Sequence, residues 1–301
     1  MTALRILVWR NTKLYFKDRG MFISSMMTPI ILLVLYATFL KRVFENSFTA
    51  AFSAAGMTIS DKLLNGLVGG QLVSSLLAVS CVTVAFCSNL LMIHDKVNGA
   101  RKDLTMAPVR ESTLSIAYYL STLLSTLIVN GIALAVCLGY LATVGWYISA
   151  SEVALLALDV FLLSMFGTAI SCCINCLLST DGQASAMGTL VSAGYGFVCG
   201  AYMPISSFSS GLQKALSFLP GTYGTSLVRN HAMGGAFREL ASDGLPEEAV
   251  KAMRDAADCN LYFFGKQVQM GTMYTIMVVS IIVLILVYVV LSRCATLRKR
   301  R

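Results

Sequence analysis

His94 to Thr113 reads HDKVNGARKDLTMAPVREST, a short charged island between two long apolar runs. The run before it, Gly66 to Ile93, and the run after it, Leu114 to Tyr147, carry no charged side chain. Each run is long enough to cross the hydrocarbon core of a bilayer, which takes about 20 apolar residues. We therefore expect the charged island to lie at one surface of a membrane and to join two membrane-spanning helices.

The composition indicates an integral membrane protein. Hydrophobic residues make up 56% of the chain and charged residues 13%, whereas soluble proteins carry about 25% charged residues. The basic residues that give the chain its net charge of +8 flank the apolar segments, and in such positions they set the orientation of membrane spans. Membrane lipids are therefore the expected surroundings, and no nucleic-acid partner is expected.

The apolar runs predict one all-α membrane domain over residues 1–301, with six transmembrane helices. The mixed polar segment 41–65 is expected to be a short outer loop. The expected spans are 22–40, 66–93, 114–147, 153–178, 184–203 and 271–291.

The largest segment outside the spans is 204–269. A short amphipathic helix is expected near its start, broken by Pro220-Gly221, with a second short piece over 222–233. Residues 245–258, LPEEAVKAMRDAAD, predict a water-exposed helix, because Pro and two Glu residues suit the first turn of a helix.

Residues 2–19, TALRILVWRNTKLYFKDR, predict an amphipathic helix that lies in the membrane interface. Two interpretations stay open, a plain anchor and a lever that touches a cytosolic partner. The apolar stripe is Leu4, Leu7, Val8, Leu14 and Tyr15, and the charged residues of this helix and its end are Arg10, Lys13, Lys17, Asp18 and Arg19.

The distribution of charge orients the spans. Basic residues are in excess in the N-terminal segment and the C-terminal tail, and slightly in excess in the charged island, whereas basic and acidic residues balance on the opposite side. Because cytoplasmic loops carry the excess of Lys and Arg, both termini and the charged island are expected in the cytosol.

Few residues could carry chemistry. The two histidines, His94 and His231, are expected on opposite sides of the membrane, so no catalytic or metal-binding constellation is expected from them. The run Cys172 to Cys176, CCINC, lies in an expected span and fits packing better than metal or redox use. The chain has no G-x-x-x-x-G-K-[ST] motif, so any ATP and magnesium should bind to another polypeptide.

Two polar residues inside the expected spans are candidates for a role in the membrane, Asp159 and Asn130. A carboxylate in a span is costly and by default suggests function. For Asp159 the favoured interpretation is a side chain that reaches interfacial water or a local partner. A hydrogen bond to another helix and a contact with substrate or protons stay open.

The charged island itself has the features of a docking segment. Gly99 permits a sharp reversal, and Pro108 ends any helix that enters from the N-terminal side, which leaves at most about two turns. Mixed charges with Leu104 and Met106 as apolar contacts would suit the groove of a soluble partner. A solvated loop is the alternative.

Three stretches in order along the chain resemble the permease subunits of ABC-2 type transporters. Residues 9–35, WRNTKLYFKDRGMFISSMMTPIILLVL, resemble their basic interfacial helix followed by a span with a central proline. The spacing Asp95-x3-Gly99-x3-Asp103-Leu104-x3-Pro108-Val109 resembles their loop between spans two and three, and Pro204-Ile205-Ser206 with Leu219-Pro220 resembles the segment after span five.

The resemblance implies a non-catalytic permease subunit of an ABC exporter in a bacterial plasma membrane. It implies a dimer with a second copy or a paralogue, cytosolic ATP-binding cassette subunits, and outer helices over 204–235 that re-enter the membrane. The loop 95–111 would couple to the ATP-binding subunit. Its expected coupling residues are Asp95, Gly99, Arg101, Lys102, Asp103, Leu104 and Pro108.

An amphipathic or lipid-like cargo would suit spans rich in Ser, Thr, Cys and Met. Two other classes of function stay open, a membrane receptor or assembly protein that docks a cytosolic partner, and an ion-coupled secondary carrier.

Overall fold

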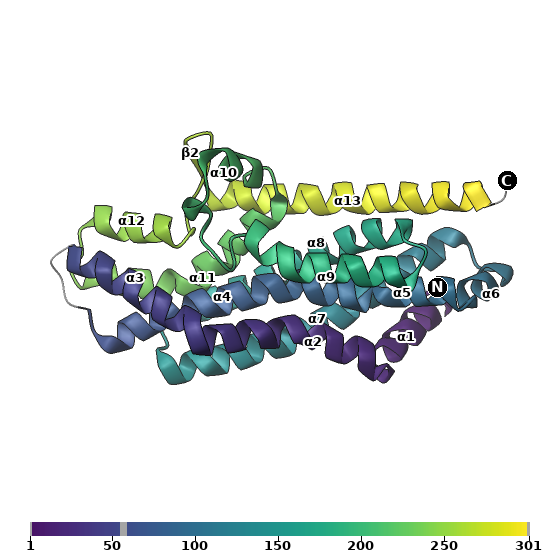
Figure 1. Ribbon diagram of the computed structural model, residues 1–301, viewed down its shortest axis with the longest axis horizontal. Coiled ribbons are helices and arrows are strands. Elements are labelled where there is room, and N and C mark those ends of the chain that lie inside the picture. Colours follow the sequence, from purple (N-terminus) through teal and green to yellow (C-terminus); the bar gives the residue numbers. More distant parts are fainter. Residues whose placement is uncertain (1, 55–58, 300–301) are drawn as a thin grey trace.

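The structure is a computed structural model that describes residues 2–54 and 59–299. It is an elongated bundle of helices, with the N-terminal helix α1, Thr2–Lys17, near the same end as the C-terminus (Figure 1). Within these described residues, five helical stretches are long and apolar enough to cross a membrane. They are Arg19–Ala50, Asp61–Val97, Glu111–Val144, Ala150–Leu177 and Met270–Arg293.

Helix α4, Asp61–Ser88, is the central element of the bundle. Nearly all of its residues are buried, and it packs against α2 (Arg19–Leu35), α7 (Glu111–Val144), α8 (Ala150–Leu177), α9 (Asp181–Val198) and α11 (Pro220–Ser242). Small residues allow this packing: a Cβ at Gly70 would lie 2.9 Å from the carbonyl oxygen of Ala232, and one at Gly167 would lie 2.8 Å from that of Cys81.

The first span continues further than expected. A π-helical turn η1, Tyr36–Leu40, leads directly into α3, Lys41–Ala54, so the expectation of a loop over 41–65 is wrong. Phe44, Phe48 and Phe52 recur every four residues and face an apolar cluster of the core. Polar residues between them hid this helical period from a hydropathy argument.

The expected span 184–203 corresponds to α9, which ends at Val198 and is not one of the five apolar stretches. Asp181, Gln183 and several glycines lower its hydropathy. Six spans are therefore not established, although the arrangement as an all-helical membrane bundle is.

The segment after α9 contains a 3-10 turn η2, Ile205–Ser207, and a short helix α10, Ser210–Leu216. Pro220 does not separate two short pieces; it occupies the first turn of α11, where its missing N–H costs nothing. Helix α11 is therefore 23 residues long and packs against α4, α8 and α13, Met270–Lys299.

A further helix and a β-hairpin lie between α11 and α13. Helix α12, Glu247–Ala256, lies within the expected range. The strands β1, Leu261–Phe263, and β2, Lys266–Val268, pair antiparallel around a tight turn in which Phe264 and Gly265 both have positive φ. Strands of three residues leave too weak an alternation to be predicted.

Candidate functional site

The charged island folds as two short helices joined by a sharp turn. Helix α5, Leu90–Val97, continues the direction of α4, and α6, Ala100–Met106, starts after Gly99. Gly99 has φ +79, a left-handed conformation that favours glycine, and Pro108 follows the end of α6. This helical hairpin projects at the end of the bundle that holds the N-terminus (Figure 1).

Asp95 fixes the base of the hairpin to two other helices. The Arg10 guanidinium of α1 donates hydrogen bonds of 2.8 and 3.1 Å to the two carboxylate oxygens of Asp95. The Tyr118 hydroxyl of α7 donates a third, 2.7 Å long. The hydrogen bond from Arg10 to Asp95 also raises the pKa of Arg10. Asp95 is buried, so its charge is held by these partners rather than by water.

Lys96, the next residue, fixes the hairpin to α8. Its Nζ donates hydrogen bonds of 2.9, 2.9 and 2.7 Å to the carbonyl oxygens of Asn175, Cys176 and Leu178. Two of these carbonyls lie in the last turn of α8 and the third is that of its C-cap residue, where a positive charge stabilises the negative end of the helix dipole. Beside it, His94 Nε2 lies 3.5 Å from Asp181 at the start of α9.

The far part of the hairpin faces outward. No residue of α6 is buried, and Met106 is 85% exposed. Lys102, Asp103 and Pro108 are exposed as well, and Arg101 is partly exposed. Leu104 instead packs toward the apolar cluster that holds Leu7 of α1 and Tyr118 of α7. The hairpin is therefore a surface helix whose base is held by α1, α7 and α8.

Helix α1 lies against α7 and supplies Arg10 to the hairpin. Leu7 and Tyr15 of the expected apolar stripe are buried. Lys13 and Lys17 are exposed, as is Arg19, the first residue of α2, and Asp18 caps α2 by accepting hydrogen bonds from the backbone N–H of Gly20 and Met21. Arg10 thus does not share an open basic face with the two lysines.

Asn130 lies inside the bundle and is fully buried. Its Oδ1 accepts a 2.7 Å hydrogen bond from Ser80 of α4, and its Nδ2 donates one of 3.4 Å to Ser164 of α8. The side chain therefore ties three helices together through polar contacts.

Asp159 has partners from two other helices. Its Oδ2 lies 2.5 Å from Nδ1 of His231 on α11, and its Oδ1 accepts a 2.6 Å hydrogen bond from Tyr274 of α13. Only 2% of Asp159 is exposed, so the part of the favoured interpretation in which the carboxylate reaches interfacial water is wrong. The alternative, a hydrogen bond to another helix, is what the structure has.

No signal in the sequence pairs Asp159 with His231, because the two residues are 72 positions apart. The sequence shows the polar groups of α11 but not their burial, and it is burial that makes partners such as Asp159 necessary. Within residues 2–54 and 59–299, no group of three or more His, Cys, Asp or Glu side chains could hold a metal ion.

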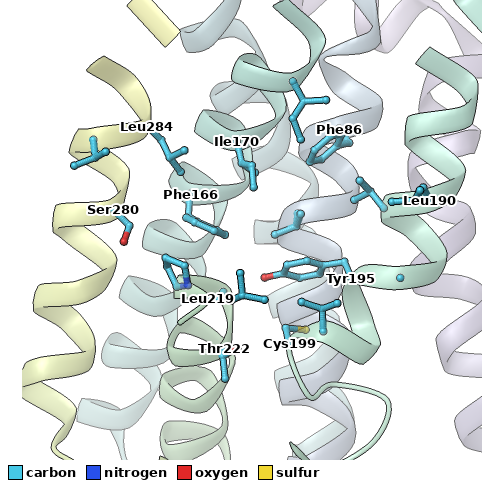
Figure 2. A pocket seen from close by; sticks show the side chains of 18 of the residues that line it. Phe86, Phe166, Ile170, Leu190, Tyr195, Cys199, Leu219, Thr222, Ser280 and Leu284 are labelled. Carbon is cyan, nitrogen blue, oxygen red and sulfur yellow. The ribbon is translucent and has the colours of Figure 1, made fainter. Parts of the chain in front are cut away.

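An apolar cavity of about 510 Å³ lies between α9 and α13 (Figure 2). Phe166 and Ile170 of α8 form its back, and Leu219 and Thr222 close the end at the first turn of α11. The cavity is lined almost wholly by apolar atoms, so it suits hydrocarbon better than a charged ligand.

Residues 2–232 match the model of the ABC-2 type transporter family. No curated protein matches the chain. Permeases of this family are typically non-catalytic and associate with an ATP-binding subunit. The match covers more than half of the chain, including the charged island and the helices that anchor it, and the chain therefore belongs to the ABC-2 type transporter family.

Proposed function

We propose that this chain is the permease subunit of an ATP-driven exporter, and that the hairpin of α5 and α6 receives force from a separate ATP-binding subunit. In this proposal a second permease copy or a paralogue completes the transport path. Both termini and the hairpin face the cytosol, and the cargo is an amphipathic or lipid-like molecule that moves outward.

The observation that carries the proposal is the contrast within the hairpin between an exposed tip and a bound base. The tip offers Lys102, Asp103 and Met106 to a partner, and none of them is buried. The base is held by Asp95 and Lys96, which contact α1, α7 and α8. A push or pull on α6 is therefore transmitted to three helices at once rather than absorbed by a loose loop.

A separate ATP-binding subunit also supplies the energy in this proposal. The chain carries no P-loop motif, which would cradle nucleotide phosphates with backbone N–H groups. ATP and magnesium therefore bind to the partner. The permease on its own should neither bind nor hydrolyse ATP, and it holds no cofactor.

The first experiment is purification of the tagged chain with its ATP-binding subunit in mild detergent. Asp103→Lys reverses a charge at the exposed first turn of α6, and we expect it to lower recovery of the ATPase by about tenfold, as for a disfavoured charge at an interface. Asp243→Lys is the matched control, because it reverses the same charge at an exposed residue outside the hairpin, at the C-terminal end of α11. ATPase recovery and ATP hydrolysis are measured for both variants.

If Asp103→Lys and Asp243→Lys recover the ATPase equally, the hairpin is not the docking site. If an ATPase binds but no candidate cargo changes its rate, a receptor or assembly protein is the better description.

The buried pair of Asp159 and His231 favours one other candidate, an ion-coupled carrier, because titratable groups in a span can carry protons. That carrier would lose transport in Asp159→Asn and would work without ATP when an ion gradient is imposed. An exporter would need ATP under every gradient. Transport into vesicles with a non-hydrolysable nucleotide separates the two candidates.

A further inference from the structure

We propose that the outer half of the molecule holds a phospholipid whose head group carries both a phosphate and an ammonium group. One of its acyl chains lies in the apolar cavity between α9 and α13. This inference rests on the proposed function, because it names the class of cargo. Two cavities of different polarity meet at the first turn of α11.

The apolar cavity opens toward the lateral surface of the bundle. Leu190 of α9 and Val279 and Val283 of α13 line it, and they are 66%, 52% and 50% exposed. The two helices stand on opposite sides of the cavity in Figure 2. Because Val279 and Val283 lie well inside a membrane-spanning stretch, the surrounding material at this depth is hydrocarbon.

The second cavity, of about 780 Å³, meets the first at Thr222 and is surrounded mostly by polar residues, so it is called the polar cavity below. Thr222 lines both cavities; Gly221 belongs to the apolar one and Tyr223 to the polar one. The polar cavity is also lined by Tyr262 and Phe264 of the β-hairpin. One molecule that reaches over the turn could therefore place a chain on one side and a head on the other.

The depths of the two cavities fit one lipid. The β-hairpin ends two residues before α13 begins at Met270, so the polar cavity lies at the level where the span starts. Val279 and Val283 are nine and thirteen residues further along, which corresponds to about 14–20 Å at the rise of an α-helix. Half of a bilayer core is about 15 Å thick, so a head in one cavity and a chain in the other matches one leaflet.

The charges of the polar cavity select the head. Lys214 of α10 lines one side and makes no ion pair among the described residues. Asp255 of α12 lines the same cavity, and only neutral donors, Asn260 and Tyr262, contact its carboxylate. Asp258 also lines it but is buried and paired with Arg229. A phosphate for Lys214 and an ammonium for Asp255 satisfy both unpaired charges.

The test uses the permease with its ATP-binding subunit in nanodiscs of phosphatidylglycerol. The probe is phosphatidylethanolamine with a diazirine on one acyl chain, compared with a diacylglycerol that carries the same chain. After illumination, cross-linked peptides are mapped by mass spectrometry. We expect the phosphatidylethanolamine probe to label α9 and α13 peptides about three- to fivefold more than the diacylglycerol, the effect of one or two exposed ion pairs.

Two matched pairs of variants locate the site. Gly194→Trp fills the apolar cavity and should abolish this labelling, whereas Gly188→Trp, on the same helix but not lining the cavity, should leave it unchanged. An added Cβ meets nothing within 4 Å at either glycine, so both variants should fold. Lys214→Gln should reduce labelling to the level of the diacylglycerol, and Lys251→Gln, on exposed α12, should not.

If both probes label α9 and α13 equally, and if Gly194→Trp does not change that labelling, the probes report lipid that surrounds the protein without a specific site. That result would overturn the inference. Loss of the ATP-binding subunit from the complex, with the labelling pattern intact, would count against the proposed function but not against the lipid site. Retention of the ATPase with loss of labelling only in Gly194→Trp and Lys214→Gln supports both.

Discussion

The two ends of the molecule each use one arginine–aspartate pair, but in different surroundings. At the hairpin end, which is the inner end in the proposed orientation, the side chains of Arg10 and Asp95 are 30% and 7% exposed, at a distance of 2.8 Å. In the half that holds α11 and α12, the outer half in the proposed orientation, the side chains of Arg229 and Asp258 are 1% and 5% exposed, at a distance of 3.5 Å. The arginine–aspartate pair is therefore partly hydrated at one end of the molecule and almost dry at the other.

This difference separates a movable attachment from a fixed one. Water can solvate Arg10 if its bond to Asp95 is broken, so a load on the hairpin can rearrange that contact at modest cost. Water cannot solvate Arg229 in the same way, because the side chain is buried and its other contact is the carbonyl oxygen of Gly200 at 2.8 Å. Asp258 also accepts a 2.6 Å hydrogen bond from the N–H of Ile205. The outer pair thus locks α11 to the chain on both sides of it.

The largest effect is expected when the charge of the outer pair is removed. Asp258→Asn keeps an oxygen for the N–H of Ile205 but leaves Arg229 as an unpaired buried charge. We expect a loss of about 3–5 kcal/mol in the free energy of unfolding, the usual cost of breaking a buried pair on one side. Thermal unfolding of the purified protein in detergent measures it.

The double variant Arg229→Met with Asp258→Asn is the control for this prediction. It removes the orphaned charge, so it should be more stable than Asp258→Asn alone. A single variant that loses less than about 1 kcal/mol would show that water reaches the pair and that the two ends do not differ in kind.

A smaller loss of stability is expected at the inner pair, together with a large loss of coupling. Asp95→Asn removes the charge that holds Arg10, but the partly exposed guanidinium can then be solvated by water. The free energy of unfolding should therefore fall by about 1 kcal/mol or less. The ATP-binding subunit should still bind, because the tip of the hairpin is unchanged. Stimulation of ATP hydrolysis by cargo should fall severalfold, and a variant with normal stimulation would contradict the role of the base.

Much of the inner end follows from local sequence. Gly99 and Pro108 bound a short helix because each restricts the backbone within a few residues, and the long uncharged runs on both sides predict spans. The pairing of Arg10 with Asp95 does not follow, since 85 positions separate them. Hydropathy places the helices but does not say how they are rotated against one another.

The outer half was less predictable for a physical reason. Its helix α11 buries Arg229, Asn230 and His231, so burial there runs opposite to hydropathy. Each of these side chains has a buried partner from another element: Asp258 for Arg229, Cys259 for Asn230 and Asp159 for His231. Polar residues are expected to be exposed when their buried partners cannot be identified from the sequence.

A smaller loss of coupling is expected at the turn of the hairpin. Gly99→Ala adds a Cβ that meets nothing within 4 Å, so its cost comes from the left-handed backbone alone, about 1–2 kcal/mol locally. Gly139→Ala in α7 is the matched control, because that glycine is helical and its Cβ would also be free. The control should be neutral or slightly stabilising.

Gly99→Ala should lower cargo-stimulated ATP hydrolysis without releasing the ATPase, and Gly99→Pro should lower it further. Equal coupling in Gly99→Ala, Gly99→Pro and Gly139→Ala would mean that the angle between α5 and α6 carries no force.

The smallest signal is expected from the thiol of Cys259 in the outer segment. Burial raises the pKa of Cys259 to about 12, and 1% of the residue is exposed. A membrane-impermeant maleimide added from outside at pH 8 should therefore label the native protein hardly at all, because thiolate is the reacting form. Asp258→Asn should raise the labelling rate by loosening the neighbouring pair, whereas Asp95→Asn should not. If Asp95→Asn exposes Cys259 as well, the outer lock responds to the inner attachment, and the two ends are parts of one transition rather than a fixed and a movable half.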